Sequence, residues 1–282
     1  MPLVVVPTPI GNMEDMTLRG LDALRNADVI ACEDTRRTIK LMNRYDIKRP
    51  LISYHRHNER ARTEELMERL LLGENIALVS DAGTPGISDP GLALIQAAID
   101  KGVSVDALPG ANALLPAILM SGISPQPFFF NGFLEGRDSE KELRAAEIAG
   151  IKATLIFYVA PHDLARELDI LNRRLGDRRA AVVREISKIH QETIHGTLAE
   201  LARIASDREI KGEIVLVVEG DRAKENDIPA DSNDDKWQKL ALHMKNAGIF
   251  DKTIVNVLSA SYGIPRNRAK NFLLQEATKG ER

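Results

Sequence analysis

Three loops rich in glycine and proline are the segments of this sequence best suited to chemistry. Each follows a short apolar run, and they cover residues 6–12, 79–91 and 108–113. Glycine lets the backbone approach a ligand closely, and proline fixes a loop before binding, so less conformational entropy is lost. In open α/β sheets, ligands bind where such loops meet at the carboxyl ends of strands. The three loops together therefore predict a small-ligand site, although one such loop alone is more often a turn.

Several common ligands are excluded by the sequence. No loop reads G-x-G-x-x-G and no G-x-x-x-x-G-K-[ST] motif occurs, which argues against a dinucleotide-type Rossmann site and a P-loop. No His/Cys cluster has metal-ligand spacing, so we expect no metal. His55 and His57 share one face of an extended segment, and such a pair is more often structural. Asp81 suits contact with a ligand ammonium or ribose; the alternative is that it caps the following loop.

The composition is that of a globular protein with a mildly basic C-terminal segment. The 282 residues are 44% hydrophobic and 28% charged. No apolar run approaches the ~18–20 residues of a membrane span. The absence of a secretion signal and the single Cys32 favour a cytoplasmic protein. Residues 231–282 hold nine Lys or Arg and six Asp or Glu, against 29 and 35 in residues 1–230, a distribution typical of RNA contact or of a solvated surface.

Strand-like runs alternate with amphipathic segments through the first half of the chain. The predicted strands are Leu3–Val6, Val29–Ala31, Leu51–Tyr54, Ile76–Ser80 and Val103–Leu108. The predicted helices are Thr17–Asn26, Asn58–Leu72 and Asp89–Lys101. This alternation is typical of a mostly parallel sheet covered by helices.

A second set of elements follows the proline-containing segment at 124–128. Its predicted strands are Phe128–Phe130, Thr154–Val159, Ala180–Glu185, Glu192–Thr197 and Glu213–Glu219. Its predicted helices are Glu140–Ala149 and Pro161–Leu175. We therefore predict an N-terminal α/β domain over residues 1–124 and a second α/β domain over residues 125–224.

The polar segment 225–236 is predicted to be a linker to a C-terminal helical domain over residues 237–282. Within that domain, the helix patterns Asp251–Ser261 and Pro265–Gln275 are joined by a turn that contains glycine. Two such helices predict a helix-turn-helix domain. The alternatives are a helical hairpin that caps the core and a dimer interface.

Motifs along the whole chain resemble the RsmI family of 16S rRNA 2′-O-ribose methyltransferases, within the tetrapyrrole-methylase superfamily. The resemblance is carried by VPTPIGN, ACEDTRRT, SYHRHNE, IALVSDAGTPGISDPG, LPGANALLPAILMSG, GFLEGR, LIFYVAPHDL, REISKIHQETIHG and KGEIVLVVEG. These strings follow the family's order from residue 3 to about residue 220, and VSDAGTPGISDPG is highly specific. The predicted helix-turn-helix resembles the family's C-terminal domain.

The resemblance implies two α/β domains with the cofactor in the cleft between them. It implies S-adenosylmethionine as methyl donor and a homodimer. The implied acceptor is the 2′-hydroxyl of a cytidine in the decoding region of 16S rRNA, in the small ribosomal subunit. Carried over by motif, the cofactor-binding residues are Pro9, Ile10, Gly11, Asp81, Gly83, Thr84, Asn112, Ala113, Phe157 and Tyr158.

A ribose hydroxyl is a poor nucleophile near neutral pH, so a base or a charge-stabilising cation would assist the reaction. The candidate catalytic residues are Asp34, His57, Glu185 and Lys188. The spacing of Glu185 and Lys188 is also that of a simple ion pair. Arginine suits bidentate phosphate contact. The candidate RNA-binding residues are Arg36, Arg37, Arg137, Arg266, Arg268 and Lys270.

The chain departs from the family pattern at three motifs. It has FYVAPHD at 157–163 where the family has FYESPHR, GFLEGR where a lysine-bearing segment follows GFLP, and EDTRRT in place of EDTRHT. These departures leave the cofactor loops intact and fall on the acceptor side. Two other functions stay open: a tetrapyrrole- or diphthine-type methyltransferase of the same fold, and a non-catalytic nucleic-acid-binding protein that responds to S-adenosylmethionine.

Overall fold

The computed structural model describes residues 3–221 and 232–279. These residues form two compact units, one that ends at Asp221 and one that contains the C-terminal helices. None of the helices in the described residues is long and apolar enough to cross a membrane.

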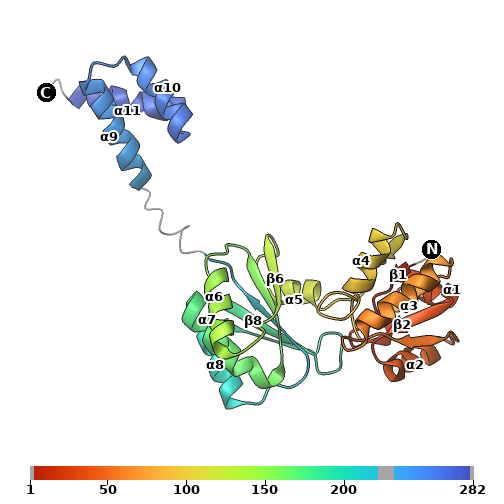
Figure 1. Ribbon diagram of the computed structural model, residues 1–282. Coiled ribbons are helices and arrows are strands. Elements are labelled where there is room, and N and C mark those ends of the chain that lie inside the picture. Colours follow the sequence, from red (N-terminus) through yellow and green to blue (C-terminus); the bar gives the residue numbers. More distant parts are fainter. Residues whose placement is uncertain (1–2, 222–231, 280–282) are drawn as a thin grey trace. The chain divides into compact units, whose positions relative to one another are not determined.

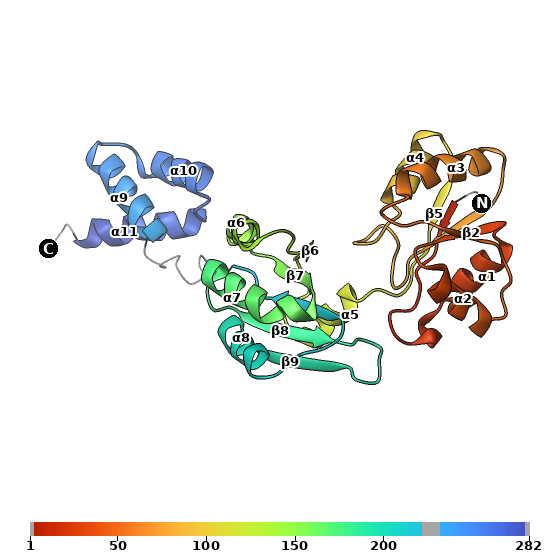
Figure 2. The same ribbon diagram turned by 60° about the horizontal axis from the view of Figure 1, so that its bottom comes forward.

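Five parallel strands form the first sheet, in the order β3-β2-β4-β1-β5. Their bounds are β1 (Leu3–Val5), β2 (Val29–Cys32), β3 (Leu51–Ser53), β4 (Ile76–Val79) and β5 (Val105–Ala107). Helices cover both faces (Figure 1 and Figure 2): α1 (Leu18–Asn26) and α2 (Thr35–Arg44) on one, α3 (Glu59–Leu71) and α4 (Leu92–Asp100) on the other. Val4 packs with the α1 side and Leu3 with the α3 side, because successive strand residues face opposite ways.

The second sheet has the order β6-β7-β10-β8-β9 and is antiparallel except for the pairing of β6 with β7. Its strands are β6 (Phe128–Phe133), β7 (Thr154–Val159), β8 (Arg179–Arg184), β9 (Glu192–Thr197) and β10 (Ile214–Val218). One face is covered by α6 (Asp138–Ile148), α7 (Leu164–Leu175) and α8 (Leu198–Asp207). The mostly parallel arrangement expected from the sequence therefore describes the first sheet alone.

Helix α5 (Leu114–Ser121) packs against the other face of the second sheet. Ala117 and Ile118 of α5 share a core with Ile156 and Val215 of that sheet. By its contacts, α5 thus belongs with the second sheet, although the sequence placed it in a domain over residues 1–124. Two short 3-10 helices, Met13–Asp15 and Pro161–Asp163, lie in connecting segments.

The C-terminal unit consists of α9 (Ser232–Asn246), α10 (Asp251–Tyr262) and α11 (Arg266–Lys279). The three helices share an apolar core formed by Trp237, Ala241, Ile254, Leu258, Ala269 and Leu273. Most of the predicted linker at 225–236 lies outside the described residues, but residues 232–236 begin α9. The expected linker is therefore too long at its C-terminal end, because polar composition alone does not distinguish a solvated first helical turn from a coil.

Candidate functional site

The three predicted loops lie side by side, because they follow the neighbouring strands β4, β1 and β5. Backbone hydrogen bonds of 2.9 Å join Thr8 and Gly83 in both directions. The Thr8 hydroxyl donates to the Ser80 carbonyl over 3.0 Å, and the Thr84 hydroxyl donates to the Ala111 carbonyl over 3.4 Å. The loops therefore fix one another as a preformed surface.

A cavity of 750 Å³ separates these loops from the second sheet. This volume falls within the range of small-molecule sites. The wall opposite the loops is formed by β6, β7 and β10, together with Ile186 and Gly212. Six predicted cofactor residues line the cavity: Ile10, Gly83, Thr84, Asn112, Ala113 and Tyr158.

Pro9 and Gly11 flank Ile10 in the first loop, outside the cavity lining. Gly11 lies against the segment that follows β8. A Cβ atom on Gly11 would come within 2.4 Å of Lys188 Cγ and 3.0 Å of the Ile186 carbonyl oxygen. Glycine is thus required here by close packing between the loop and that segment.

Phe157 is not at the site, in contrast to the expectation from the family motif. Its side chain is fully buried in the core beneath α6 and α7, whereas the neighbouring Tyr158 lines the cavity. Successive strand residues point to opposite faces, so only one residue of this pair can face a ligand. Phe157 is therefore a core residue.

Asp34 and Asp81 brace the start of α2. Asp34 caps that helix by accepting from the Arg36 amide at 2.9 Å, and it pairs with the Arg36 guanidinium at 2.7 Å. Asp81 accepts from the Asp34 amide at 3.0 Å and pairs with Arg37 at 3.3 Å. The hydrogen bonds from Arg36 lower the pKa of Asp34 to about 2, so Asp34 is a weak base at neutral pH. These contacts favour a structural role for both carboxylates.

His57 is exposed on the segment after β3, outside the cavity lining. Its ring lies 6.0 Å from that of His55, edge to face. Within residues 3–221 and 232–279, no group of three or more His, Cys, Asp or Glu side chains could hold a metal ion. The histidine pair is accordingly best described as part of the segment that leads into α3.

Glu185 and Lys188 form an ion-paired turn at the rim of the cavity. Lys188 Nζ lies 2.8 Å from Glu185 Oε1 and 3.1 Å from Glu213 Oε2, and Glu213 lines the cavity. The hydrogen bond from Lys188 lowers the pKa of Glu185. Glu185 and Ser187 have φ of 51° and 63°. Non-glycine residues rarely adopt this region, and such strain concentrates at functional sites.

Asp89 is a carboxylate of the cavity lining that was not among the predicted site residues. The helix pattern placed it at the start of a helix, whereas α4 begins three residues later and Asp89 lies in the loop that lines the cavity. Burial raises its pKa to about 6; Glu33 and Asp81 add to this effect, and Arg56 opposes it. Its place inside a Gly/Pro-rich loop after a strand was the available signal. A cationic ligand would favour the ionised form of this carboxyl.

The predicted RNA-binding residues lie on three exposed surfaces. Arg36 and Arg37 are exposed on α2, where the exposed side chains of Lys40 and Arg44 continue the basic surface. Arg137 is exposed at the N-cap of α6. The remaining three are exposed on α11: Arg266, Arg268 and Lys270.

The family described as Tetrapyrrole (Corrin/Porphyrin) Methylases matches residues 2–202. Solved structures of the same fold include a cobalt precorrin-4 methyltransferase, with 16% identity, a TM-score of 0.58 and coverage of 77% of this chain and 94% of that chain. A diphthine synthase gives 18% identity, a TM-score of 0.61 and coverage of 77% and 89%. The fold is therefore that of the tetrapyrrole methylases, as the sequence motifs implied.

The ribosomal RNA small subunit methyltransferase I of Bacillus subtilis is 44% identical over 269 residues, which cover 94% of this chain and 91% of that protein. The protein of the same name from Halalkalibacterium halodurans is 40% identical over 279 residues, with coverage of 97% and 95%. The chain belongs to this family of methyltransferases, and the resemblance read from its motifs is confirmed.

Replacing Gly11 by alanine is expected to lower the free energy of unfolding by about 1–3 kcal/mol, because the added methyl group overlaps Lys188. Displacement of Lys188 should also weaken ligand binding at the rim. Thermal melting and calorimetric titration with S-adenosylmethionine measure the two effects. Gly150→Ala is the matched control, since no atom lies within 4 Å of the added Cβ. Equal behaviour of the two variants would contradict the close packing at Gly11.

Proposed function

We propose that this chain transfers a methyl group from S-adenosylmethionine to the 2′-hydroxyl of a cytidine in the decoding region of small-subunit rRNA. The observation that carries this proposal is the cavity in which preformed loops and the Asp89 carboxylate face apolar and aromatic side chains. The names of the two related bacterial proteins support the class of acceptor.

The groups that line the cavity suit S-adenosylmethionine. Asp89 offers a carboxylate to the ammonium group, and Thr84 a hydroxyl to the polar part of the molecule. Ile214 and Val215 of β10 offer an apolar surface for adenine. When bound, the cofactor supplies an electrophilic methyl group on a sulfonium. The residues of the chain contribute by holding the donor in line with the acceptor, and such positioning supplies much of the acceleration.

Two of the four candidate catalytic residues lie beside the cavity. Lys188 forms ion pairs with Glu185 and with Glu213, and Glu213 lines the cavity. Asp34 and His57 lie outside the cavity lining. Because Glu185 is held ionised by Lys188, we assign this pair the role of fixing the rim. In this proposal, the acceleration rests on positioning.

The acceptor side of the proposal is supported by exposed cationic side chains. Arg36, Lys40 and Arg44 lie at helical spacing along the exposed part of α2, and Arg137 begins α6. Basic side chains in such rows suit a phosphate backbone. We further propose that the enzyme acts on an assembled subunit, which presents the target nucleotide unstacked. Equal methylation of free rRNA and of assembled subunits would contradict this part.

Incubation with labelled S-adenosylmethionine tests the proposed function directly. We expect label to enter small ribosomal subunits and not a precorrin-type tetrapyrrole. Label on the tetrapyrrole would favour the second enzymatic alternative. Cofactor binding without transfer to any acceptor would favour a regulator.

We also propose a homodimeric, cytoplasmic protein. Leu115, which lines the cavity, and Leu119 of α5 are 50% and 73% exposed, and a partner subunit that covers α5 would bury both side chains. Light scattering of the purified chain should give twice the monomer mass of 31.2 kDa. A monomer at micromolar concentration would contradict the dimer.

A further inference from the structure

A β-bulge in β6 gathers aromatic side chains on the cavity face of the second sheet. The register of β6 against β7 shifts between Phe130 and Gly132, and Gly132 has a φ of 75°. Without this shift, the alternation of the strand would place Phe133 on the face opposite Phe130. With it, Phe128, Phe130 and Phe133 all line the cavity, and Phe133 pairs with Tyr158. We call these four rings the aromatic face.

Side chains on the other face of the sheet hold the bulge in place. Arg144 Nε donates to Asn131 Oδ1 at 2.9 Å, and Asn131 Nδ2 donates to the Phe133 carbonyl at 3.3 Å. The Arg144 guanidinium also lies 5.8 Å from the centroid of the Phe129 ring. A supported bulge beside a cavity is typical of one that aims a side chain at a ligand.

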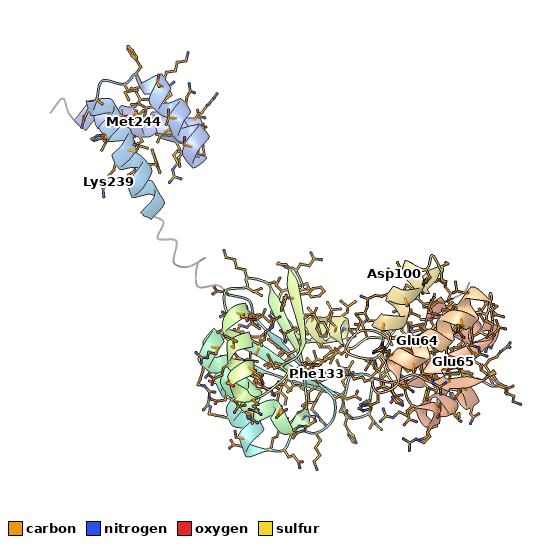
Figure 3. The ribbon with its side chains drawn as sticks, in the orientation of Figure 1. Glu64, Glu65, Asp100, Phe133, Lys239 and Met244 are labelled. Carbon is orange, nitrogen blue, oxygen red and sulfur yellow. The ribbon has the colours of Figure 1, made fainter. Side chains whose placement is uncertain are left out.

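The aromatic face combines packed rings with open ones. Tyr158 makes edge-to-face contacts with Phe130 at 4.9 Å and with Phe133 at 5.6 Å between centroids. Phe128 and Phe133 are nevertheless 42% and 44% exposed, whereas Ile214 on the β10 side of the cavity is 3% exposed. The cavity therefore has a closed apolar side along the buried Ile214 and Val215 of β10 and an open aromatic side at β6, which is one of the two edge strands of the sheet. Figure 3 shows Phe133 in the region between the two sheets.

We propose that the aromatic face binds the base of the acceptor nucleotide by stacking, with Phe133 as the principal contact. The inference rests on the proposed function. A nucleotide that stays attached to a large RNA has to enter from the open side, whereas a free cofactor fits the closed side. Unstacked RNA bases bind to aromatic side chains by stacking, and enzymes that modify a nucleotide take it out of its stack. Asp89 and the loops then remain for the cofactor.

The test compares Phe133→Ala with the wild-type chain in two measurements. Methylation rates across a range of small-subunit concentrations give kcat/KM, and calorimetry gives the Kd of S-adenosylmethionine. Loss of one stacked base is worth about 5- to 150-fold in kcat/KM, and we expect a fall in this range with an unchanged cofactor Kd. Phe133→Tyr should restore most of the rate, because it keeps a flat ring.

Leu72→Ala removes an apolar side chain that is 84% exposed at the end of α3 and outside the cavity lining, so it serves as the control and should leave both values unchanged. A raised cofactor Kd in Phe133→Ala would overturn the inference by placing the ring in the cofactor site. Unchanged kcat/KM in that variant would overturn it as well, while leaving the proposed function intact. If the wild-type chain binds S-adenosylmethionine and methylates no rRNA, the proposed function fails, and the inference fails with it.

Discussion

Replacing Asp89 by asparagine is expected to weaken S-adenosylmethionine binding about 10- to 100-fold and, at the same time, to raise the melting temperature. The loss of affinity follows from removing a charged hydrogen-bond partner of the ligand ammonium, which is worth about 1.5–3 kcal/mol. The gain in stability follows because burial disfavours the ionised carboxyl, whose pKa is raised from 3.8 to about 6. A residue that weakens the fold and strengthens binding is typical of a functional site.

The same carboxyl makes cofactor binding depend on pH. Asp89 faces Glu33 and Asp81, which raise its pKa, and Arg56 and Ser80, which lower it. Since the folded pKa is above the ordinary value, the stability that Asp89 contributes is present below about pH 4 and is lost as pH rises through about 6. Cofactor binding has the opposite pH dependence, because the ammonium group of S-adenosylmethionine pairs with the ionised form of Asp89. The Kd should therefore rise as pH falls below about 6 in the wild type and stay flat in Asp89→Asn.

Calorimetric titrations between pH 5 and pH 8, with melting curves in the same buffers, measure both effects. Asp169→Asn removes an exposed carboxylate of α7 and is the matched control. A variant at Asp89 that binds the cofactor as tightly as the wild type would remove Asp89 from the site. A lowered melting temperature would show that the carboxylate is structurally satisfied.

Replacing Lys141 by methionine is expected to lower the free energy of unfolding by about 3–5 kcal/mol. Lys141 of α6 and Glu167 of α7 are 5% and 3% exposed and form an ion pair, with Asp163 3.4 Å from the ammonium. Burial already raises the pKa of Glu167, and removal of the ammonium leaves that carboxyl without its partner. Proton uptake by Glu167 in the variant should therefore reduce the difference in stability between the variant and the wild type as pH falls.

Urea unfolding followed by circular dichroism measures this change, because the single tryptophan, Trp237, reports on the C-terminal unit. The double variant Lys141→Met/Glu167→Leu should recover most of the loss, since apolar groups replace both charges. Arg173→Met breaks exposed ion pairs of α7 and should change stability little. A small effect of Lys141→Met alone would contradict a buried pair.

Most elements of the α/β fold were predictable because each has a strong local pattern. Most strands are short runs rich in apolar and β-branched residues, and such a run marks a strand without reference to its partner in the sheet. Helix α5 was missed because Pro116 in its first turn resembles a loop signal. Helix α8 was also missed, although Thr197 and Glu200 form the capping box that announces its start. The antiparallel pairing of the second sheet is set by long-range contacts that strand patterns do not encode.

In the candidate site, too, the parts with a local sequence signal were predictable and the parts set by tertiary contacts were not. The three loops were predictable, since glycine and proline mark them in the sequence. Asp89 was hidden by a helix pattern that extends past the true helix start, and the bulge at β6 depends on contacts between Asn131 and Arg144. The choice of Tyr158 over Phe157 depends on which face of β7 the cavity occupies. Such features follow from tertiary structure alone.

The most direct test of the account is to identify the nucleoside that receives the methyl group. Small ribosomal subunits that lack the modification are incubated with the chain and labelled S-adenosylmethionine, and the rRNA is digested and analysed by mass spectrometry. We expect the label to appear in 2′-O-methylcytidine from the decoding region. Label on a base, or an unlabelled rRNA in the presence of measured cofactor binding, would contradict it.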